Sequence, residues 1–301
     1  MRRLALLALI LVMPGSAQAL RLPGAPRCPI FPRTNPWNTR VDKLPVAANS
    51  DAIIRSIGVD VGLHPDFGSG LYDGQPIGIP FDVVTKKTPR TRPSFEYADE
   101  SDKGPYPIPR NVHIEGGSDR HALLIDRDAC RLYELFALAG SESGRQAGSG
   151  AIWNLRSNKL RPAGWTSADA AGLPIFPGLA RYDEVARGVI DHALRFTVAR
   201  TRRAYVYPAR HYASSLTDPN LPPMGLRVRL RASFDVSGFP KQARVILVAL
   251  KRYGMLVADN GANWFISGAP SAHWNNDDLH TLGQVKGADF EVVQTGPLTV
   301  P

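Results

Sequence analysis

Cysteine and methionine are scarce in this chain, with two and four among 301 residues. The sequence also lacks the G-x-S-x-G, S-x-x-K, H-E-x-x-H, Walker and zinc-ribbon patterns. Their absence argues against the usual serine hydrolases, zincins and nucleotide-binding proteins, whose chemistry requires those spacings. We therefore expect neither a cofactor nor a metal site from the sequence.

Long apolar runs are missing beyond the N-terminus, which argues against a stable membrane span. The run at 4–13 follows Arg2 and Arg3 and is far shorter than the roughly 20 residues of a transmembrane helix. Ala17 and Ala19 supply the small residues that a signal peptidase requires. We predict a signal peptide over 1–19 and a secreted or periplasmic protein.

No linker, charge block or internal repeat divides the rest of the chain. The 27 glycines and 26 prolines are spread along its length, and 44% of the residues are hydrophobic against 21% charged. That balance suffices for a hydrophobic core and is unlike that of a disordered chain. We predict a single β-rich globular domain over 20–301.

The two cysteines are candidates for one disulfide, Cys28 with Cys130, because an exported chain enters an oxidising compartment. Neither cysteine has the C-x-x-C spacing of a redox or zinc site. We expect the bond to tie the entry segment to the middle of the fold.

Short strands separated by turns dominate the pattern. One segment, 241–253, has a helical period, and shorter helices are expected after Ser50, after Ser167 and around 277–282. This pattern predicts a mainly β fold, a β-sandwich or jelly-roll with one long helix and short helical insertions. The expected strands cover 77–84, 121–126, 131–136, 193–198, 203–207, 226–231, 255–258, 264–267 and 290–293.

Two strand regions carry more detailed expectations. In 226–231, apolar residues alternate with Arg227, Arg229 and Arg231, which predicts one packed face and one wet, cationic face. The segment 259–263, with its Asn-Gly pair, reads as a hairpin turn joining 255–258 to 264–267. We expect no chemistry at that turn.

Carboxylates in loops are the strongest candidates for catalysis. Asp66 lies two residues after His64, while Asp99 and Asp102 belong to a dense acidic loop in which repulsion can raise one pKa. Asp169 follows a helix-capping pattern that could by itself explain it. Each of these aspartates has a structural alternative, as a turn, a surface loop or a helix cap.

Residues suited to binding a sugar form a second group. Aromatic rings stack on pyranose faces, whereas Arg, His and Asp side chains hydrogen-bond the hydroxyl groups. A structural ion pair or a half-buried histidine is the alternative for several of them. The candidates are His64, Asp119, His121, Trp165, His192, Arg195, Tyr207, Arg210 and His211.

Several motifs together resemble a group of secreted bacterial proteins of uncharacterised activity. The resemblance covers nearly the whole chain after the predicted signal peptide and implies one exported domain, but no activity, cofactor or catalytic residue. The motifs are Asn35-Pro-Trp-Asn38, His64-Pro-Asp-Phe-Gly68, Ala151-Ile-Trp-Asn154, Thr166-Ser-Ala-Asp-Ala-Ala-Gly172, His192-Ala-Leu-Arg195 and Tyr253-Gly-Met255.

The leading functional hypothesis is a secreted carbohydrate-active enzyme that hydrolyses glycosidic bonds of an extracellular or cell-wall polysaccharide. Glycoside hydrolysis requires chiefly two carboxyl groups at a fixed separation. The alternatives are a polysaccharide lyase acting on a uronate polymer and a non-catalytic glycan- or envelope-binding protein. The net charge of +9 suits an anionic glycan. A nucleic-acid partner is not expected, because the arginines are scattered and form no recognisable module.

Overall fold

The computed structural model describes residues 21–142 and 144–301. The predicted signal peptide, 1–19, lies outside these residues. The largest sheet has six strands in the order β1-β14-β10-β13-β12-β15 and mixes parallel with antiparallel pairs. Its strands are β1 (His64–Asp66), β10 (Leu194–Val198), β12 (Arg227–Leu230), β13 (Met255–Asn260), β14 (Phe265–Ser267) and β15 (Phe290–Val292).

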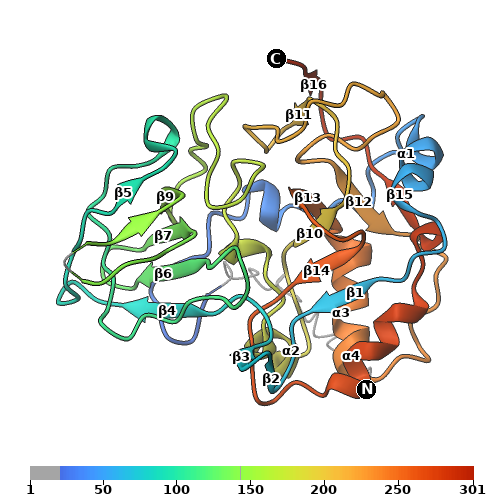
Figure 1. Cartoon of the computed structure of the whole chain (residues 1–301). Coiled ribbons are helices and arrows are strands. Elements are labelled where there is room, and N and C mark those ends of the chain that lie inside the picture. The colour runs from blue at the N-terminus through green and yellow to red at the C-terminus, as the bar shows by residue number, and fades with distance from the viewer. Residues whose placement is uncertain (1–20, 143) are drawn as a thin grey trace, which may run out of the picture.

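A second sheet has four strands in the order β4-β6-β7-β9. Figure 1 shows this sheet on the left and the six-stranded sheet on the right. Its strands are β4 (Phe81–Val84), β6 (Ala122–Asp126), β7 (Arg131–Phe136) and β9 (Ser149–Asn154). Three two-stranded pairs complete the strands: β2 (Leu71–Tyr72) with β3 (Gln75–Pro76), β5 (Ser94–Phe95) with β8 (Gln146–Ala147), and β11 (Tyr205–Val206) with β16 (Leu298–Thr299).

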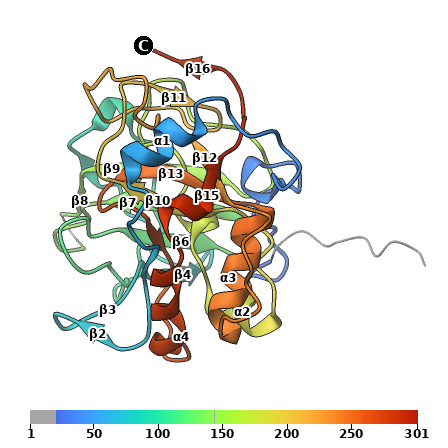
Figure 2. The same ribbon diagram turned by 90° about the vertical axis from the view of Figure 1, so that its right-hand side faces the viewer.

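The α-helices have 12 residues or fewer; α1 precedes the first strand, and the others lie between strands in the sequence. In Figure 2 the helices α2, α3 and α4 lie below the six-stranded sheet, and α1 lies above it. The α-helices are α1 (Ser50–Ile57), α2 (Tyr182–Arg187), α3 (Lys241–Arg252) and α4 (Asn276–His280). The 3-10 turns are η1 (Pro36–Asn38), η2 (Ala98–Glu100), η3 (Phe176–Gly178), η4 (Thr281–Gln284) and η5 (Gly287–Asp289).

The prediction of a mainly β fold with short helical insertions is confirmed. The helix expected over 241–253 is present as α3, but its 12 residues make it a helix of ordinary length, so one long helix is not confirmed. The mixed pairing also differs from the antiparallel arrangement of a jelly-roll. The sandwich arrangement and the domain boundary 20–301 stay predictions.

One hydrophobic cluster contains buried residues of both large sheets. Leu123 and Ile125 of β6 belong to it together with Phe196 of β10 and Leu256 of β13. Because α1 and α3 also turn their apolar faces into this cluster, the sheets and their covering helices share one core. No helix among the described residues is long and apolar enough to cross a membrane.

Two expectations about the strands are wrong. The segment 259–263 is not a hairpin turn, because β10 lies between β13 and β14 and pairs with both. The predicted wet face of β12 is buried at two of its three arginines: Arg227 is 3% exposed and Arg229 is 9% exposed, whereas the Arg231 side chain, just past the strand, stays 39% exposed. Arg227 donates to the carbonyl of Pro36, and Arg229 donates to the Glu291 carboxylate on β15. The alternation is real, but a loop carbonyl and a carboxylate, rather than water, cover Arg227 and Arg229.

The predicted disulfide between Cys28 and Cys130 is confirmed, with the two Cα atoms 5.2 Å apart. Cys130 is the last residue of the turn between β6 and β7 and has a positive φ of 50°. The bond closes a loop whose ends are 102 residues apart in the sequence. It therefore fixes the entry segment against the four-stranded sheet.

Replacing both cysteines, Cys28→Ser with Cys130→Ser, is expected to lower the free energy of unfolding by about 2–5 kcal/mol, since the unfolded chain regains the freedom that the bond removed. Urea unfolding monitored by fluorescence and circular dichroism measures the change. Reduction of the wild-type protein should lower the midpoint by the same amount. Equal midpoints for oxidised wild type and double variant would contradict this role.

Candidate functional site

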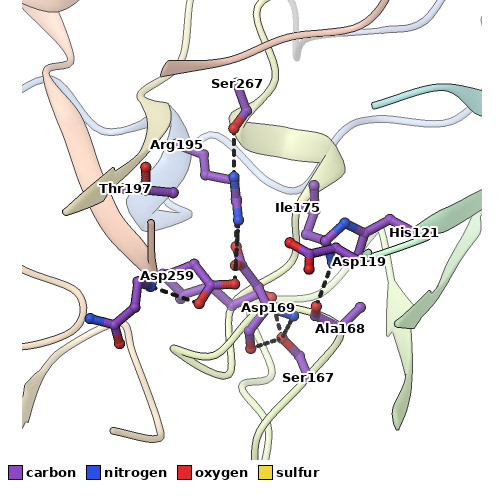
Figure 3. Close-up of polar contacts among 12 residues, drawn as sticks. Asp119, His121, Ser167, Ala168, Asp169, Ile175, Arg195, Thr197, Asp259 and Ser267 are labelled. Carbon is purple, nitrogen blue, oxygen red and sulfur yellow. Dashed lines mark hydrogen bonds and ion pairs between the residues drawn. The ribbon is translucent and has the colours of Figure 1, made fainter. Parts of the chain in front are cut away.

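A buried ion pair lies at the centre of the molecule. The Arg195 guanidinium on β10 donates from Nε to Asp169 Oδ2 at 2.7 Å and from Nη2 to Oδ1 at 2.8 Å. The side chains form this fork in Figure 3, where the third arginine nitrogen reaches the Ser267 hydroxyl on β14. Arg195 is 5% exposed and Asp169 is 1% exposed, and charges so deeply buried require such partners.

Asp169 lies on an irregular loop of turns over 166–172 rather than in the helix predicted after Ser167. The Asp169 amide donates to Ser167 Oγ at 2.9 Å, so the expected capping contact forms without a helix following it. Ser149, the first residue of β9, fixes the loop, because its hydroxyl donates to the Ser167 carbonyl. These contacts direct the Asp169 carboxylate toward Arg195.

Asp259 reaches the same ion pair from the end of β13. Its Oδ2 lies 3.5 Å from Arg195 Nη2, whose guanidinium also binds Asp169, so the two carboxyl groups are neighbours. Burial and the neighbouring Asp169 raise the pKa of Asp259 to about 8, although Arg195 acts in the opposite direction. The structure thus pairs an arginine-bound carboxylate with a carboxyl group that retains its proton at neutral pH.

The position of Asp259 depends on an irregularity in the sheet. Along the β10–β13 pair, Phe196 faces Val257 but the next residue, Thr197, faces Asp259, so Ala258 is an extra residue on β13. A bulge of this kind bends the strand and redirects the side chains that follow. It brings Asp259 beside Arg195 and Asp169.

A cavity of about 380 Å³, here called the acid-pair cavity, opens next to Asp169 and Asp259. Its volume is typical of small-molecule sites. Four of its lining residues carry carboxyl groups, and none is lysine or arginine. The lining residues are Tyr97, Glu100, Asp119, Phe136, Ser149, Thr166, Ser167, Ala168, Asp169, Ala170, His211, Ala213, Asp259 and Asn260.

His211 and Glu100 form a second polar pair in this cavity. His211 Nδ1 lies 2.8 Å from the Ala170 carbonyl and donates to it, so the neutral ring carries its lone pair on Nε2. That nitrogen lies 4.0 Å from Glu100 Oε2. Glu100 Oε2 also accepts from the Thr166 amide at 2.8 Å, which holds the carboxylate in place.

A larger cavity of about 730 Å³, here called the hairpin cavity, contains the predicted His64 and Asp66. The His64 ring stacks on Phe265, with centroids 3.9 Å apart. Burial raises the pKa of Asp66 despite the nearby imidazole, and it lowers the pKa of His64. Tyr72, on the β2–β3 hairpin, lines the same cavity.

The loop over 115–121 separates the two cavities. Glu115 lines the hairpin cavity, and Asp119 lines the acid-pair cavity. Glu115 Oε2 binds His121 Nδ1, while His121 Nε2 donates to the Ala168 carbonyl at 2.9 Å. Burial lowers the pKa of His121, but the bond to Glu115 outweighs it and the pKa ends above its ordinary value. The buried His121 thus joins this loop to the loop that carries Asp169.

Two predicted carboxylates, Asp99 and Asp102, line neither of these cavities. Asp99 is exposed on η2. Asp102 accepts from Arg161 Nη1 at 2.7 Å and from the Ile152 amide at 2.8 Å, so its side chain already has firm partners. Trp165 stacks over the same arginine and lines a separate hollow with Asp102.

The remaining predicted binding residues do not reach the acid-pair cavity either. His192 is fully buried, with Nε2 3.0 Å from Glu184 Oε2, and Glu184 in turn pairs with Arg181. Arg210 donates from Nε to the Arg161 carbonyl at 3.0 Å. Tyr207 is 49% exposed and lines neither cavity. His64, Asp66, Asp102 and His192, which were expected to meet in one cleft, therefore lie in three different places.

Sequence reasoning missed Asp259, Glu100 and Glu115 as site residues. The signal for Asp259 was a carboxylate directly after an apolar strand, which the Asn-Gly pair obscured. Glu100 lay within the acidic loop already considered, but nothing in the sequence distinguished it from Asp99. Asp119, Asp169, Arg195 and His211 were predicted, and the structure gathers them at or directly beneath the acid-pair cavity.

Comparison with protein-family models, curated proteins and solved structures finds no match for this chain. The site must therefore be interpreted from its own donors and acceptors. Within the described residues, no group of three or more His, Cys, Asp or Glu side chains is arranged to hold a metal ion.

Removing the guanidinium, Arg195→Met, is expected to lower the free energy of unfolding by about 3–5 kcal/mol, because Asp169 is then a buried charge without its counter-charge. Urea unfolding at constant pH measures this loss. The double variant Arg195→Met/Asp169→Asn should recover at least about 1 kcal/mol, since no unpaired charge remains. A loss below about 0.5 kcal/mol in the single variant would show that the pair does not organise the fold.

The raised pKa of Asp259 also predicts a pH dependence of stability. The folded chain retains this proton up to about pH 8, whereas the unfolded chain releases it near pH 3.8. Stability is therefore lost as the pH rises through this window. Asp259→Asn should reduce the decline in unfolding free energy between pH 5 and pH 8 by at least about 1 kcal/mol. The exposed Asp60→Asn serves as the control, and parallel curves for Asp259→Asn and wild type would refute the shifted pKa.

Proposed function

We propose that this protein hydrolyses glycosidic bonds in an extracellular or cell-wall polysaccharide, with Asp259 as the general acid. The observation that carries the proposal is the position of Asp259, which lines the acid-pair cavity beside the pair formed by Arg195 and Asp169. Burial and the Asp169 carboxylate raise the pKa of Asp259 to about 8, which favours a proton on this group at neutral pH, next to a space of ligand size. Export through the predicted signal peptide and the Cys28–Cys130 disulfide support action outside the cytoplasm.

In this mechanism Asp259 donates its proton to the glycosidic oxygen as the bond to the anomeric carbon breaks. Asp169 and Arg195 position Asp259, and the Asp259 carboxylate left behind stays next to the guanidinium. The leaving sugar departs as an alcohol. The general acid is thus restored when the carboxylate regains a proton from solvent.

The second carboxyl group must come from another segment. Asp169 is not available for this role, because the Arg195 guanidinium binds both of its carboxylate oxygens. Glu100 is the best-placed base, since the Thr166 amide fixes it and its side chain stays 31% exposed. It would accept a proton from the water whose oxygen attacks the anomeric carbon and then release that proton to solvent, with His211 beside it.

The contacts of the arginines favour hydrolysis over elimination from a uronate. A lyase needs a cation free to neutralise the substrate carboxylate. All three nitrogens of Arg195 are engaged with Asp169 and Ser267, and Arg210 Nε donates to a backbone carbonyl. The Glu100 and Asp119 carboxyl groups, which line the same cavity, would also repel an anionic sugar.

The test is a polysaccharide panel read both for reducing ends and for the absorbance of unsaturated products. Asp259→Asn should lower kcat/KM at least about 100-fold, because general acid catalysis contributes that much. The control Asp60→Asn should retain wild-type activity. In the wild type, kcat/KM should fall above about pH 8, as the acid loses its proton.

Several results would overturn the proposal. Full activity of Asp259→Asn on the preferred polymer would show that Asp259 is not the general acid. Unsaturated products would identify a lyase. Saturable glycan binding without cleavage after long incubation would identify a binding protein.

A further inference from the structure

The hairpin cavity is the larger of the two cavities, and the acid–base mechanism does not use it. It lies across the loop over 115–121 from the acid-pair cavity. Glu115, which lines the hairpin cavity, binds His121, and His121 Nε2 donates to the carbonyl of Ala168, which lines the acid-pair cavity. Hydrogen bonds therefore link the linings of the two cavities through this loop.

The wall of this cavity carries an aromatic side chain exposed to solvent. The β2–β3 hairpin turns at Asp73 and Gly74, whose φ angles of 49° and 76° are typical of the type I′ turn that Asp-Gly favours. In both ribbon views the hairpin projects at the lower edge of the molecule near α4 (Figures 1 and 2). Tyr72, at the end of β2, is 74% exposed while lining the cavity.

Contacts at the base of the hairpin fix its position. A Cβ on Gly116 would lie 2.7 Å from Gln75 Cβ, so the absence of a side chain lets β3 approach the loop that separates the cavities. Asn276 Oδ1 accepts from the Ser69 amide at 2.9 Å, and its Nδ2 donates to the Ser69 carbonyl at 3.0 Å. Tyr72 is therefore presented by a braced hairpin.

The rest of the lining has the composition of a sugar site. The stacked rings of His64 and Phe265 form a second aromatic surface. Carboxylates and amides surround it, and none of the lining residues is lysine or arginine. Aromatic faces bind the C–H surface of a pyranose, and acceptor oxygens bind its hydroxyl groups.

We infer that the hairpin cavity is a distal subsite that binds an uncharged sugar unit of the same polysaccharide whose bond is cleaved beside Asp259. This inference rests on the proposed function and deepens it, because a substrate that occupies both cavities must be a chain rather than a single sugar. Tyr72 provides the stacking surface. The carboxylates select against uronate units.

The experiment measures binding and cleavage as a function of chain length. The ligands are neutral disaccharides and hexasaccharides from glucan, xylan, mannan and chitin, with a galacturonate hexasaccharide as the anionic comparator. Binding is measured by calorimetry with Asp259→Asn protein, so that no chain is cut during titration. The best neutral hexasaccharide should bind at least about 10-fold more tightly than its disaccharide and than the anionic one.

Three substitutions on this hairpin isolate the subsite. Tyr72→Ala should weaken hexasaccharide binding about 10-fold and leave the disaccharide unchanged, whereas Tyr72→Phe, which keeps the ring, should bind like the parent. Leu71→Ala is the matched control, because Leu71 is 67% exposed on the same strand but does not line the cavity. Equal hexasaccharide binding by Tyr72→Ala and Leu71→Ala, or no neutral hexasaccharide bound at all, would overturn the subsite.

The failure of this inference can be told apart from failure of the proposed function. Cleavage that depends on Asp259 but not on chain length or on Tyr72 would support the proposed hydrolase and refute the distal subsite. Binding that depends on Tyr72 in a protein that cleaves nothing would support a sugar-binding subsite and refute the proposed hydrolase.

Discussion

Arg195 is buried, and its guanidinium can remain in the core only because Asp169 binds it along two hydrogen bonds. This constraint joins β10, an interior strand of the six-stranded sheet, to the loop over 166–172. It also dictates the chemistry nearby. With Asp169 committed to Arg195, a second carboxyl group at the same place, that of Asp259, is more stable with a proton than without one. The fold and the acid therefore depend on one ion pair.

Glu134 is another carboxyl group near the site whose pKa is raised by burial. Glu134 on β7 accepts from the amides of Ile175 and Phe176, and burial raises its pKa to about 7. It holds the segment after the 166–172 loop from the side of the four-stranded sheet. The site is thus braced from both sheets, by Arg195 on one side and by Glu134 on the other, and both braces involve charges or protons in the core.

The local pattern of the sequence predicted much of the fold. The apolar runs at 121–126 and 131–136 became β6 and β7, and the helical period at 241–253 became α3. The order of the strands was not predictable, because nothing local indicates that β10 lies between β13 and β14. The prediction of a wet arginine face on β12 is wrong for a similar reason, since the carbonyl that binds Arg227 and the carboxylate that binds Arg229 come from distant segments.

The candidate site was predicted only in part, for the same physical reason. Asp169 and Arg195 were recognised as chemically capable, but their pairing spans 26 residues and depends on a loop that local propensity had suggested as a helix. Asp259 was assigned to a turn, and its role depends on the bulge that shifts the β10–β13 register. Residues such as His192 and Asp102 were indistinguishable in sequence from site residues, yet they have structural partners at 3.0 Å and 2.7 Å.

The charge of the whole chain differs from that of its two cavities, and this difference bears on the choice of substrate. The protein carries a net charge of +9, but the lining of both cavities contains carboxylates and no lysine or arginine. The positive charge can attract the molecule to an anionic envelope, while the cavities themselves favour uncharged sugars. Attraction to a surface and selection of a substrate are thus assigned to different parts of the molecule.

The most direct test is to titrate the Asp259 carboxyl group itself. Carbon-detected NMR of the labelled aspartate side chains, with Asp259→Asn used to assign the resonance, reports its protonation at each pH. The account predicts a midpoint near 8 for Asp259. A midpoint near 4, the value of an ordinary exposed aspartate, would contradict it.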